Sequence, residues 1–459
     1  MDTATHSRSA THRGTGGEQL WSRRTLVHSS CAAALLAPWA RWAGAALGAG
    51  SGVSSGAAGA PAPGRQTPAP GAAGGEIVLG TSAAFTGPSR GLGNELYRGA
   101  MAFFREVNES GGINGRRITL KLYDDGYQPD PCVQNTLKLM LEDDVFLLFG
   151  YVGTPTVTRV LPMLKKFQEE QIYMFFPFTG AQPQREPPYG DFAFNLRASY
   201  RQETAGLVEN FLATGRRRIA VFYQADAYGR SGWAGVRAAL ENHGETIAGE
   251  ATYQRGARFT GTMRAQVEIL QRAAPDAVIC VGAYAACAAF ARDAIDLGLR
   301  VPIANLSFVG SENLVNLLSE GRDDPETYTR WLVNSQVVPS YEDESVPAVR
   351  EYRELMARHN PEIPPEFLDE PYDPLPQSFV SLEGFVNAKL MCEIFRRFDG
   401  EPVRAGLEDA VFSIRDFDLG IGERVSFGPD RRQGLQRVYY TVVENGRFVP
   451  LTDWNALPA

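Results

Sequence analysis

Threonines and aromatic residues gather in loops that follow a series of short apolar segments. The clearest loops are 84–88 (Ala-Phe-Thr-Gly-Pro), 150–156 (Gly-Tyr-Val-Gly-Thr-Pro-Thr) and 177–180 (Pro-Phe-Thr-Gly), and all are poor in basic residues. A threonine hydroxyl beside free backbone N–H groups at a helix start can hold a carboxylate, and aromatic rings can wall a small ligand. Thr154 and Thr179 are therefore candidate ligand-binding residues. The alternative is that these threonines only cap helices.

A repeated alternation of strands and helices must position these loops. Amphipathic helices are expected at 93–110 and 132–142, between short apolar segments. The expected strands are 76–82, 117–123, 145–149, 172–176, 192–196, 219–223, 277–281 and 303–306. This alternation predicts an α/β fold with mostly parallel sheets flanked by helices. Ligands of such sheets bind outside the carboxyl ends of the strands, where the loops named above lie.

Length and composition exclude several classes of function. The 459 residues are enough for two to four domain-sized units, and 44% of them are hydrophobic. The formal net charge is −8, which disfavours nucleic-acid binding. After residue 75 only His243 and His359 remain as histidines, so no metal site is predicted. The sequence has no G-x-S-x-G, H-E-x-x-H or phosphate-binding loop motif, so we expect neither an enzyme nor a cofactor.

The N-terminal 75 residues have the organisation of an export signal followed by a tether. Arg23 and Arg24 precede Leu26 and a mildly apolar, Ala-rich segment, which indicates a twin-arginine signal peptide over 1–49. The Ala-, Gly- and Pro-rich stretch 50–75 is expected to be a leader or tether. These features predict an exported, periplasmic protein. A chance arginine pair in an unstructured tail is the alternative.

A membrane-spanning helix and a lipid-modified cysteine are both disfavoured in the N-terminal segment. Pro38 and Arg41 interrupt the apolar run, which argues against a membrane-spanning helix. No apolar segment precedes Cys31, as lipidation of this cysteine would require.

The cysteines after residue 75 have no metal-ligand spacing. We expect buried thiols, with a disulfide as the alternative. These cysteines are Cys132, Cys280, Cys287 and Cys392.

A series of motifs resembles a known family. The most specific is N-x-x-G-G-I-N-G at 108–115. Further matching segments lie at 80–88, 99–116, 123–126, 222–229, 381–385, 427–434 and 442–448. Together they resemble the type I extracytoplasmic solute-binding proteins, the leucine/isoleucine/valine-binding-like receptors of ABC importers. The resemblance extends over residues 76–452.

This resemblance implies two α/β lobes that close over a small ligand. The first lobe is expected at 76–198 and 336–430, and the second at 199–335 and 431–459. A monomer that delivers its ligand to an ABC permease and ATPase membrane complex is the implied function. A ligand-sensing receptor of the same fold that signals to a membrane partner is the alternative.

The resemblance also assigns residues to the cleft. The family's hydroxyl that holds the ligand carboxylate matches Thr154, and its next polar loop matches Thr179. The other ligand-binding positions match Leu92, Tyr200, Tyr228, Tyr284, Ser307 and Phe308.

One departure from the family pattern bears on the ligand. Amino-acid-binding members pair the ligand ammonium with carboxylates at positions that align with Tyr200 and Ser307, which are uncharged. An unpaired ammonium in a closed cleft is costly. Either Glu312, Asp226 or Asp124 takes this role, or the ligand is an amine-free acid or amide. The alternative for Asp124 and its neighbour is a role as turn residues.

Residues 360–376 are rich in proline and acidic residues. We expect an inserted loop in the first lobe. It is either a solvated loop or a docking surface for the permease.

Overall fold

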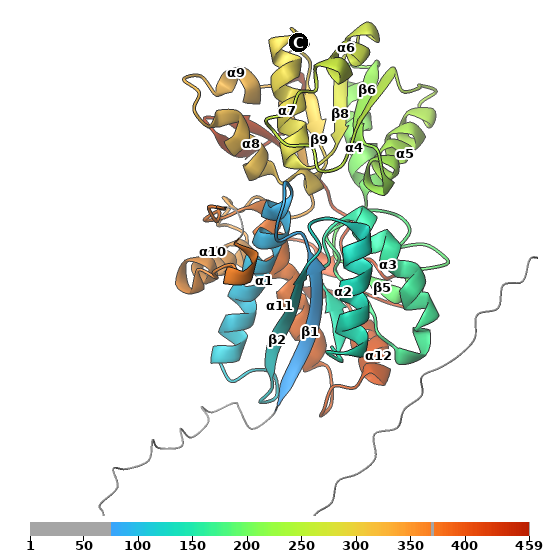
Figure 1. Ribbon diagram of the computed structural model, residues 1–459, viewed down its shortest axis with the longest axis vertical. Coiled ribbons are helices and arrows are strands. Elements are labelled where there is room, and N and C mark those ends of the chain that lie inside the picture. The colour runs from blue at the N-terminus through green and yellow to red at the C-terminus, as the bar shows by residue number, and fades with distance from the viewer. Residues whose placement is uncertain (1–74, 369–370, 459) are drawn as a thin grey trace, which may run out of the picture. The chain divides into compact units, whose positions relative to one another are not determined.

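Short strands alternate with helices along the chain, as the sequence predicts. The computed structural model describes residues 75–368 and 371–458, which all belong to one compact unit. The strands form two main sheets, and we call each sheet with the helices that pack on it a lobe (Figure 1). The predicted signal peptide and the leader up to residue 74 lie outside the described residues.

Lobe 1 is built on a five-stranded parallel sheet. Three of its strands, at 147–149, 174–175 and 193–194, are buried and apolar throughout, as expected where helices cover both faces of a sheet. From one edge to the other, the strands are β2 (Arg117–Asp124), β1 (Glu76–Ala83), β3 (Leu147–Phe149), β4 (Met174–Phe175) and β5 (Ala193–Phe194).

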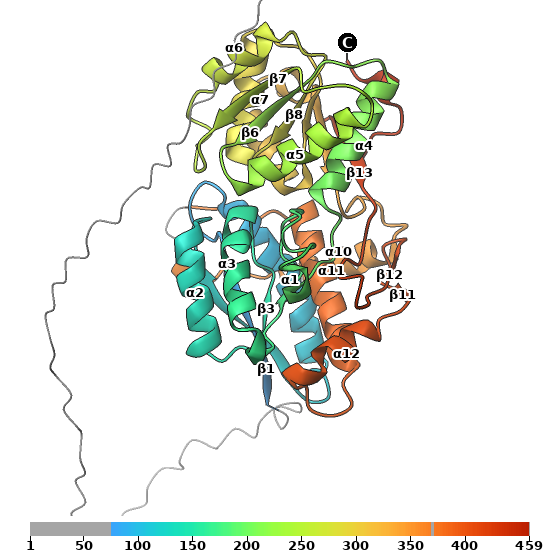
Figure 2. The same ribbon diagram turned by 90° about the vertical axis from the view of Figure 1, so that its right-hand side faces the viewer.

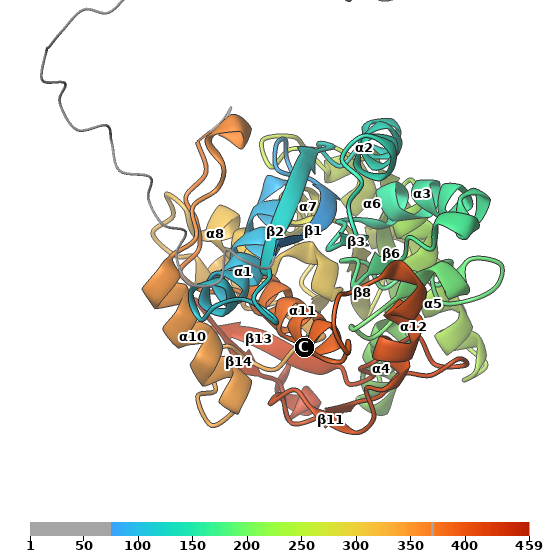
Figure 3. The same cartoon turned by 90° about the horizontal axis from the view of Figure 1, so that it is seen from below.

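The helices of lobe 1 come from two distant parts of the sequence. Helices α1 and α11 pack side by side on one face of the sheet, and α2 and α3 cover the other face (Figure 3). The helices are α1 (Arg90–Glu109), α2 (Pro129–Leu141), α3 (Thr154–Lys166), α10 (Pro347–His359), α11 (Phe379–Arg396) and α12 (Leu407–Phe412). A two-stranded ribbon of β11 (Phe417–Asp418) and β12 (Arg424–Val425) follows α12.

Lobe 2 is built on a seven-stranded mixed sheet. Five of its strands run parallel, while β13 and β14 run antiparallel at one edge. In order, they are β14 (Arg447–Pro450), β13 (Tyr439–Glu444), β10 (Leu332–Gln336), β9 (Ile303–Asn305), β8 (Ala277–Val281), β6 (Ile219–Gln224) and β7 (Gly249–Tyr253).

The helices of lobe 2 cover both faces of its central strands. Helices α4 and α5 pack together on one face (Figures 1 and 2), while α7 and α8 pack together on the other (Figure 1). The helices are α4 (Tyr200–Ala213), α5 (Ala227–Glu241), α6 (Arg264–Arg272), α7 (Tyr284–Asp296), α8 (Ser311–Ser319) and α9 (Glu326–Thr329). Within the described part of the chain, none of these or the other helices is long and apolar enough to cross a bilayer.

The chain passes between the lobes at 195–199, 337–346 and 426–438. The first and third passages are hydrogen-bonded to each other. The Asn195 N–H donates to the Arg432 carbonyl oxygen at 2.8 Å, and the Gly434 N–H donates to the Asn195 carbonyl oxygen at 2.9 Å. These two passages therefore form a short paired connection between the sheets.

The proline- and acid-rich segment 360–376 is anchored to helix α1. Arg98 donates to the backbone carbonyl oxygens of Pro361, at 2.9 Å, and Leu375, at 2.6 Å. Glu95 accepts hydrogen bonds from the Tyr372 hydroxyl, at 2.9 Å, and from the Leu375 N–H, at 3.0 Å. A buried ion pair of 2.9 Å joins Glu95 and Arg98 themselves. Both ends of the segment are thus held by one buried charge pair.

Candidate functional site

The two predicted threonines lie together at the carboxyl end of the lobe 1 sheet. Thr154 is the first residue of α3, and Thr179 follows β4. Their hydroxyl oxygens are 2.6 Å apart, and both side chains are buried. The cap residue of α3 is Gly153, so Thr154 does not act as a helix cap. In contrast, Thr156 donates to the Val152 carbonyl oxygen of its own turn.

Two glycines allow this close approach. Gly153 has a φ of 104°, which few other residues adopt, and a Cβ there would lie 2.2 Å from the Tyr127 ring. A Cβ on Gly180 would lie 2.5 Å from the Tyr200 ring. A side chain at either glycine would therefore push an aromatic ring away from the threonines.

Five aromatic rings from both lobes meet beside the threonine pair. Tyr127 and Phe178 come from lobe 1, and Tyr200, Tyr228 and Phe308 come from lobe 2. Ring centroids are 5.2 Å apart for Tyr200–Tyr228, 4.7 Å for Tyr228–Phe308, 5.3 Å for Phe178–Phe308 and 5.8 Å for Tyr127–Phe308. Three of these rings, those of Tyr200, Tyr228 and Phe308, belong to predicted site residues, whereas Tyr127 and Phe178 were not predicted. Phe178 lies in the loop 177–180 and Tyr127 lies just after the predicted strand 117–123, and these loop positions were the available signal.

Two tyrosines of this aromatic cluster, Tyr200 and Tyr228, have buried hydroxyls that make no hydrogen bond with any described residue. The Tyr200 hydroxyl nevertheless lies beside those of Thr154 and Thr179. Burial raises the pKa of Tyr200, whereas the Arg197 charge and the neighbouring hydroxyls of Thr154 and Thr179 oppose that rise. Burial also raises the pKa of Tyr228 well above its usual value. Both hydroxyls therefore stay protonated and can donate a hydrogen bond.

A buried arginine that the sequence analysis missed lies against the aromatic cluster. The Arg197 guanidinium carbon is 4.7 Å from the centroid of the Phe178 ring and 6.0 Å from that of Tyr200. Its Nη2 donates to the Ser307 hydroxyl of lobe 2. Arg197 therefore connects Ser307 to the other predicted site residues.

Two buried glutamates flank this arginine. Glu203 on α4 and Glu383 on α11 lie 3.6 Å and 3.5 Å from the Arg197 guanidinium nitrogens. Burial raises the pKa of the Glu383 carboxyl to about 7, although the Arg197 charge works against the shift. Burial disfavours the charged form of Arg197, but Glu383 and Glu203 together raise its pKa. This charge cluster connects the lobes, and no local sequence pattern marked it.

Leu92 and Tyr284 lie at a different contact between the lobes. The Gly91 N–H of α1 donates to the Tyr284 hydroxyl at 3.2 Å. A Cβ on Gly310 would lie 2.7 Å from Leu92 and 3.3 Å from the Tyr284 ring. The structure therefore brings six of the eight predicted site residues together around Arg197. They are Thr154, Thr179, Tyr200, Tyr228, Ser307 and Phe308. The other two, Leu92 and Tyr284, pack together around Gly310.

The three acids considered for a ligand ammonium already have structural partners. Asp124 accepts hydrogen bonds from the backbone of the loop after β1, including the Phe85 N–H at 2.8 Å. Asp226 caps α5 and forms a 3.1 Å ion pair with Arg255. Glu312 accepts from the Phe379 N–H at 3.1 Å, and burial raises the pKa of its carboxyl to about 7. The turn-residue interpretation of Asp124 agrees with these contacts.

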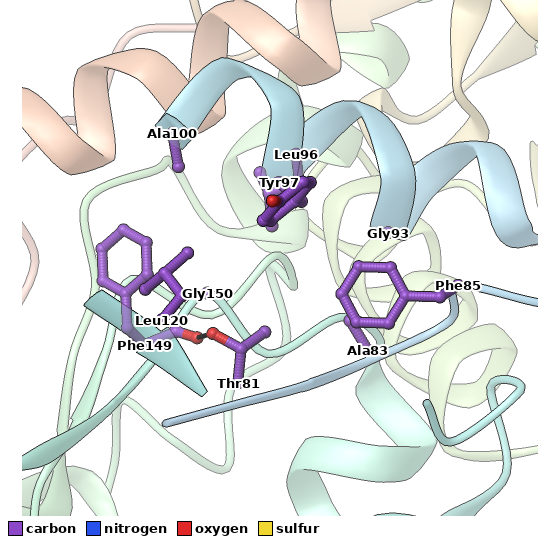
Figure 4. Close-up of a pocket in the computed structure, with 10 residues that line it drawn as sticks. All are labelled: Thr81, Ala83, Phe85, Gly93, Leu96, Tyr97, Ala100, Leu120, Phe149 and Gly150. Carbon is purple, nitrogen blue, oxygen red and sulfur yellow. Dashed lines mark hydrogen bonds between the residues drawn. The ribbon is translucent and has the colours of Figure 1, made fainter. Parts of the chain in front are cut away.

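A small apolar cavity in lobe 1 lies apart from the predicted site residues. Its volume is about 10 Å³, roughly the space of one water molecule. Its lining consists of Thr81, Ala83, Phe85, Gly93, Leu96, Tyr97, Ala100, Leu120, Phe149 and Gly150 (Figure 4). The four cysteines of the described residues are free and buried, which agrees with the expected buried thiols.

Two α/β lobes, joined by several passages and meeting at a buried polar and aromatic site, define the class of two-lobed solute-binding proteins. The family model for periplasmic binding proteins matches residues 76–447, and the chain belongs to this family. The resemblance found from the sequence motifs is thereby confirmed, as is the fold class.

Individual relatives agree with this membership. A possible leucine/isoleucine/valine-binding protein from Rhodopirellula baltica has a similar crystal structure, with a TM-score of 0.75 and 29% identity over 86% of this chain and 100% of that chain. The Leu/Ile/Val-binding protein homolog 3 of Brucella melitensis is 24% identical over 52% of this chain and 62% of its own length. An amino acid binding protein of Pseudomonas aeruginosa is 26% identical over 37% and 44%. The matches thus span less than two thirds of these two curated relatives.

Proposed function

We propose that this chain is the extracytoplasmic solute-binding component of an ABC importer. In this proposal Thr154 and Thr179 hold the carboxylate of a small solute, and the rings of Tyr200 and Tyr228 contact it from lobe 2. The observation that carries the proposal is the buried pair of threonine hydroxyls on lobe 1, which lies beside the buried Tyr200 hydroxyl of lobe 2. The neighbouring Tyr228 hydroxyl has no hydrogen-bond partner among the described residues. A solute that contacts both lobes stabilises their closed arrangement.

The solute candidates are branched-chain or other amino acids, amides, and aromatic or aliphatic acids. The names of the relatives support amino acids, and the hydroxyl pair supports a carboxylate. In this proposal the chain works as a monomer in the periplasm and passes its solute to a permease and ATPase complex. Leu92 and Tyr284 form part of the cleft wall. Loss of solute uptake when the chain is deleted, and its return on complementation, would test the transport role.

Removal of single hydroxyls tests the binding role. Thr154→Val and Thr179→Val keep the side-chain shape and remove one hydrogen-bonding group each. Hydrogen bonds to charged groups contribute about 1.5–3 kcal/mol, so each variant should bind a carboxylate solute roughly ten- to a hundredfold more weakly. Calorimetry and the rise in melting temperature with solute measure this loss.

The matched control is Thr158→Val, one turn further along α3. The Thr158 hydroxyl donates to the Thr154 carbonyl oxygen at 2.7 Å, away from the hydroxyl pair. The control should retain its affinity for the solute. Unchanged affinity in both Thr154→Val and Thr179→Val would contradict the assigned site.

A further inference from the structure

The interface between the lobes contains its own buried cation. Arg197 is 2% exposed, stacks against Phe178, and donates to Ser307 on the opposite lobe. The Arg197 guanidinium also lies over the Tyr200 ring, 6.0 Å from the ring centroid. A solute held between the threonine pair and these lobe 2 residues would therefore lie beside a positive charge of the protein.

The nearby carboxylates are already occupied. Glu203 accepts hydrogen bonds from the Ser307 N–H at 2.8 Å, the Ser307 hydroxyl at 3.0 Å and the Ser335 hydroxyl at 2.6 Å. Both Glu203 and Glu383 are also ion-paired with Arg197. An ammonium group would have to compete with a buried guanidinium for these oxygens, and close like charges repel in a buried site.

The hydrogen-bonding groups that remain available in this cluster are donors. Among the described residues, Arg197 Nε and the Tyr228 hydroxyl are buried and have no hydrogen-bond partner. Arg197 Nη1 faces Glu383 at 3.5 Å without a hydrogen bond, and the Tyr200 hydroxyl lies beside those of Thr154 and Thr179. Unsatisfied buried donors are unfavourable, and an acceptor supplied by a solute would satisfy them. Together with the threonine hydroxyls, they form a site that offers donors and one cation.

We infer that the solute is an organic carboxylate without an amino group, and that Arg197 is the residue that selects it. This inference rests on the proposed binding function and narrows its solute class. Glu203 and Glu383 already form ion pairs with Arg197, so an ammonium would have to displace the guanidinium from them. Its remaining N–H groups favour a solute rich in oxygen acceptors.

The test uses acid and amino-acid pairs that differ only in the α-amino group. The purified full chain is titrated by calorimetry with 4-methylpentanoate and leucine, 3-phenylpropanoate and phenylalanine, and 3-(4-hydroxyphenyl)propanoate and tyrosine. The amide 4-methylpentanamide is included as an uncharged probe. In at least one pair, the acid should bind at least about tenfold more tightly than the amino acid, because the ammonium has no free partner.

An Arg197→Lys variant gives a second readout. Lysine keeps the charge that excludes an ammonium but lacks the planar set of donors. Its affinity for the preferred acid should fall, while the amino acid should still be rejected. The wild-type titrations test the solute class by themselves, so this part of the inference does not depend on whether the variant folds.

Each result decides between the two proposals. Equal or tighter binding of the amino acid in every pair that binds overturns the amine-free assignment and leaves the binding function intact. Binding of the amide alone overturns the assignment of a carboxylate and likewise leaves the binding function intact. If no probe binds, both the solute class and the proposed binding site are wrong.

Discussion

The buried pair of Glu95 and Arg98 should contribute strongly to stability because it anchors segment 360–376. Arg98 is 2% exposed and Glu95 is fully buried. Arg98→Met would leave the Glu95 carboxylate without its cation and would remove the donor from two backbone carbonyl oxygens. Breaking a buried ion pair by removing one partner costs about 3–5 kcal/mol. We expect a loss of this size in the free energy of unfolding.

Urea unfolding followed by tryptophan fluorescence measures this loss. The double variant Glu95→Gln with Arg98→Met removes both charges and should be at least about 1 kcal/mol more stable than Arg98→Met alone, because no buried charge stays unpaired. Limited proteolysis should cut segment 360–376 faster in the single variant. This readout separates local release of the segment from global destabilisation.

The matched control is an exposed ion pair of similar length. Arg237 and Glu241 are 2.7 Å apart, and about half of each side chain is exposed. Arg237→Met should cost no more than about 0.5 kcal/mol. A loss for Arg98→Met as small as that of the control would refute the argument that burial makes the Glu95 pair important.

Three further predictions concern pH, a backbone turn and export. Burial raises the pKa of Glu383 to about 7 from a usual value of 4.5, so the folded state holds its proton more tightly, and stability should fall as pH rises from about 4.5 to 7. A flatter pH profile of melting temperature in Glu383→Gln would support this, and an unchanged slope would count against it. Gly153→Ala should weaken solute binding and destabilise the fold more than Gly244→Ala, because both have positive φ but only the first Cβ meets the Tyr127 ring. Equal effects on urea unfolding would show that the clash is unimportant. Lysines in place of the arginines at 23–24 should block export of a fused reporter, and normal export would contradict the twin-arginine prediction.

Much of the fold could be predicted because its strands and helices have characteristic local patterns of apolar residues in the sequence. The predicted strand 277–281 coincides with β8, which is apolar throughout because helices cover both of its faces. The edge strand β7 gave a weaker signal because its residues alternate between exposed and buried, and it was not predicted. The predicted strand 172–176 is shorter in the structure because the positive φ of Phe176 ends β4 at Phe175.

The candidate site could be predicted only in part, since its charged residues interact across long sequence separations. Thr154 and Thr179 lie in loops whose composition is informative by itself. Arg197 binds Ser307, which is 110 positions away, and Glu383 lies on a helix that enters lobe 1 late in the chain. An isolated charged residue in a helix gives no local sign of burial. Tyr127 and Phe178 were missed because sequence composition indicates that a loop contributes to a site but does not indicate which of its rings faces the site.

The paired passages between the lobes have a consequence for affinity. In the proposed mechanism, a solute binds one lobe first and then meets the second half of its site on the same chain. The passages at 195–199 and 426–438 are hydrogen-bonded to each other, so they restrict sliding and twisting of one lobe against the other. The second half-site is therefore present at a high effective concentration. Tight capture then needs few contacts from each lobe, because the connection between the lobes has already limited the orientations that must be searched.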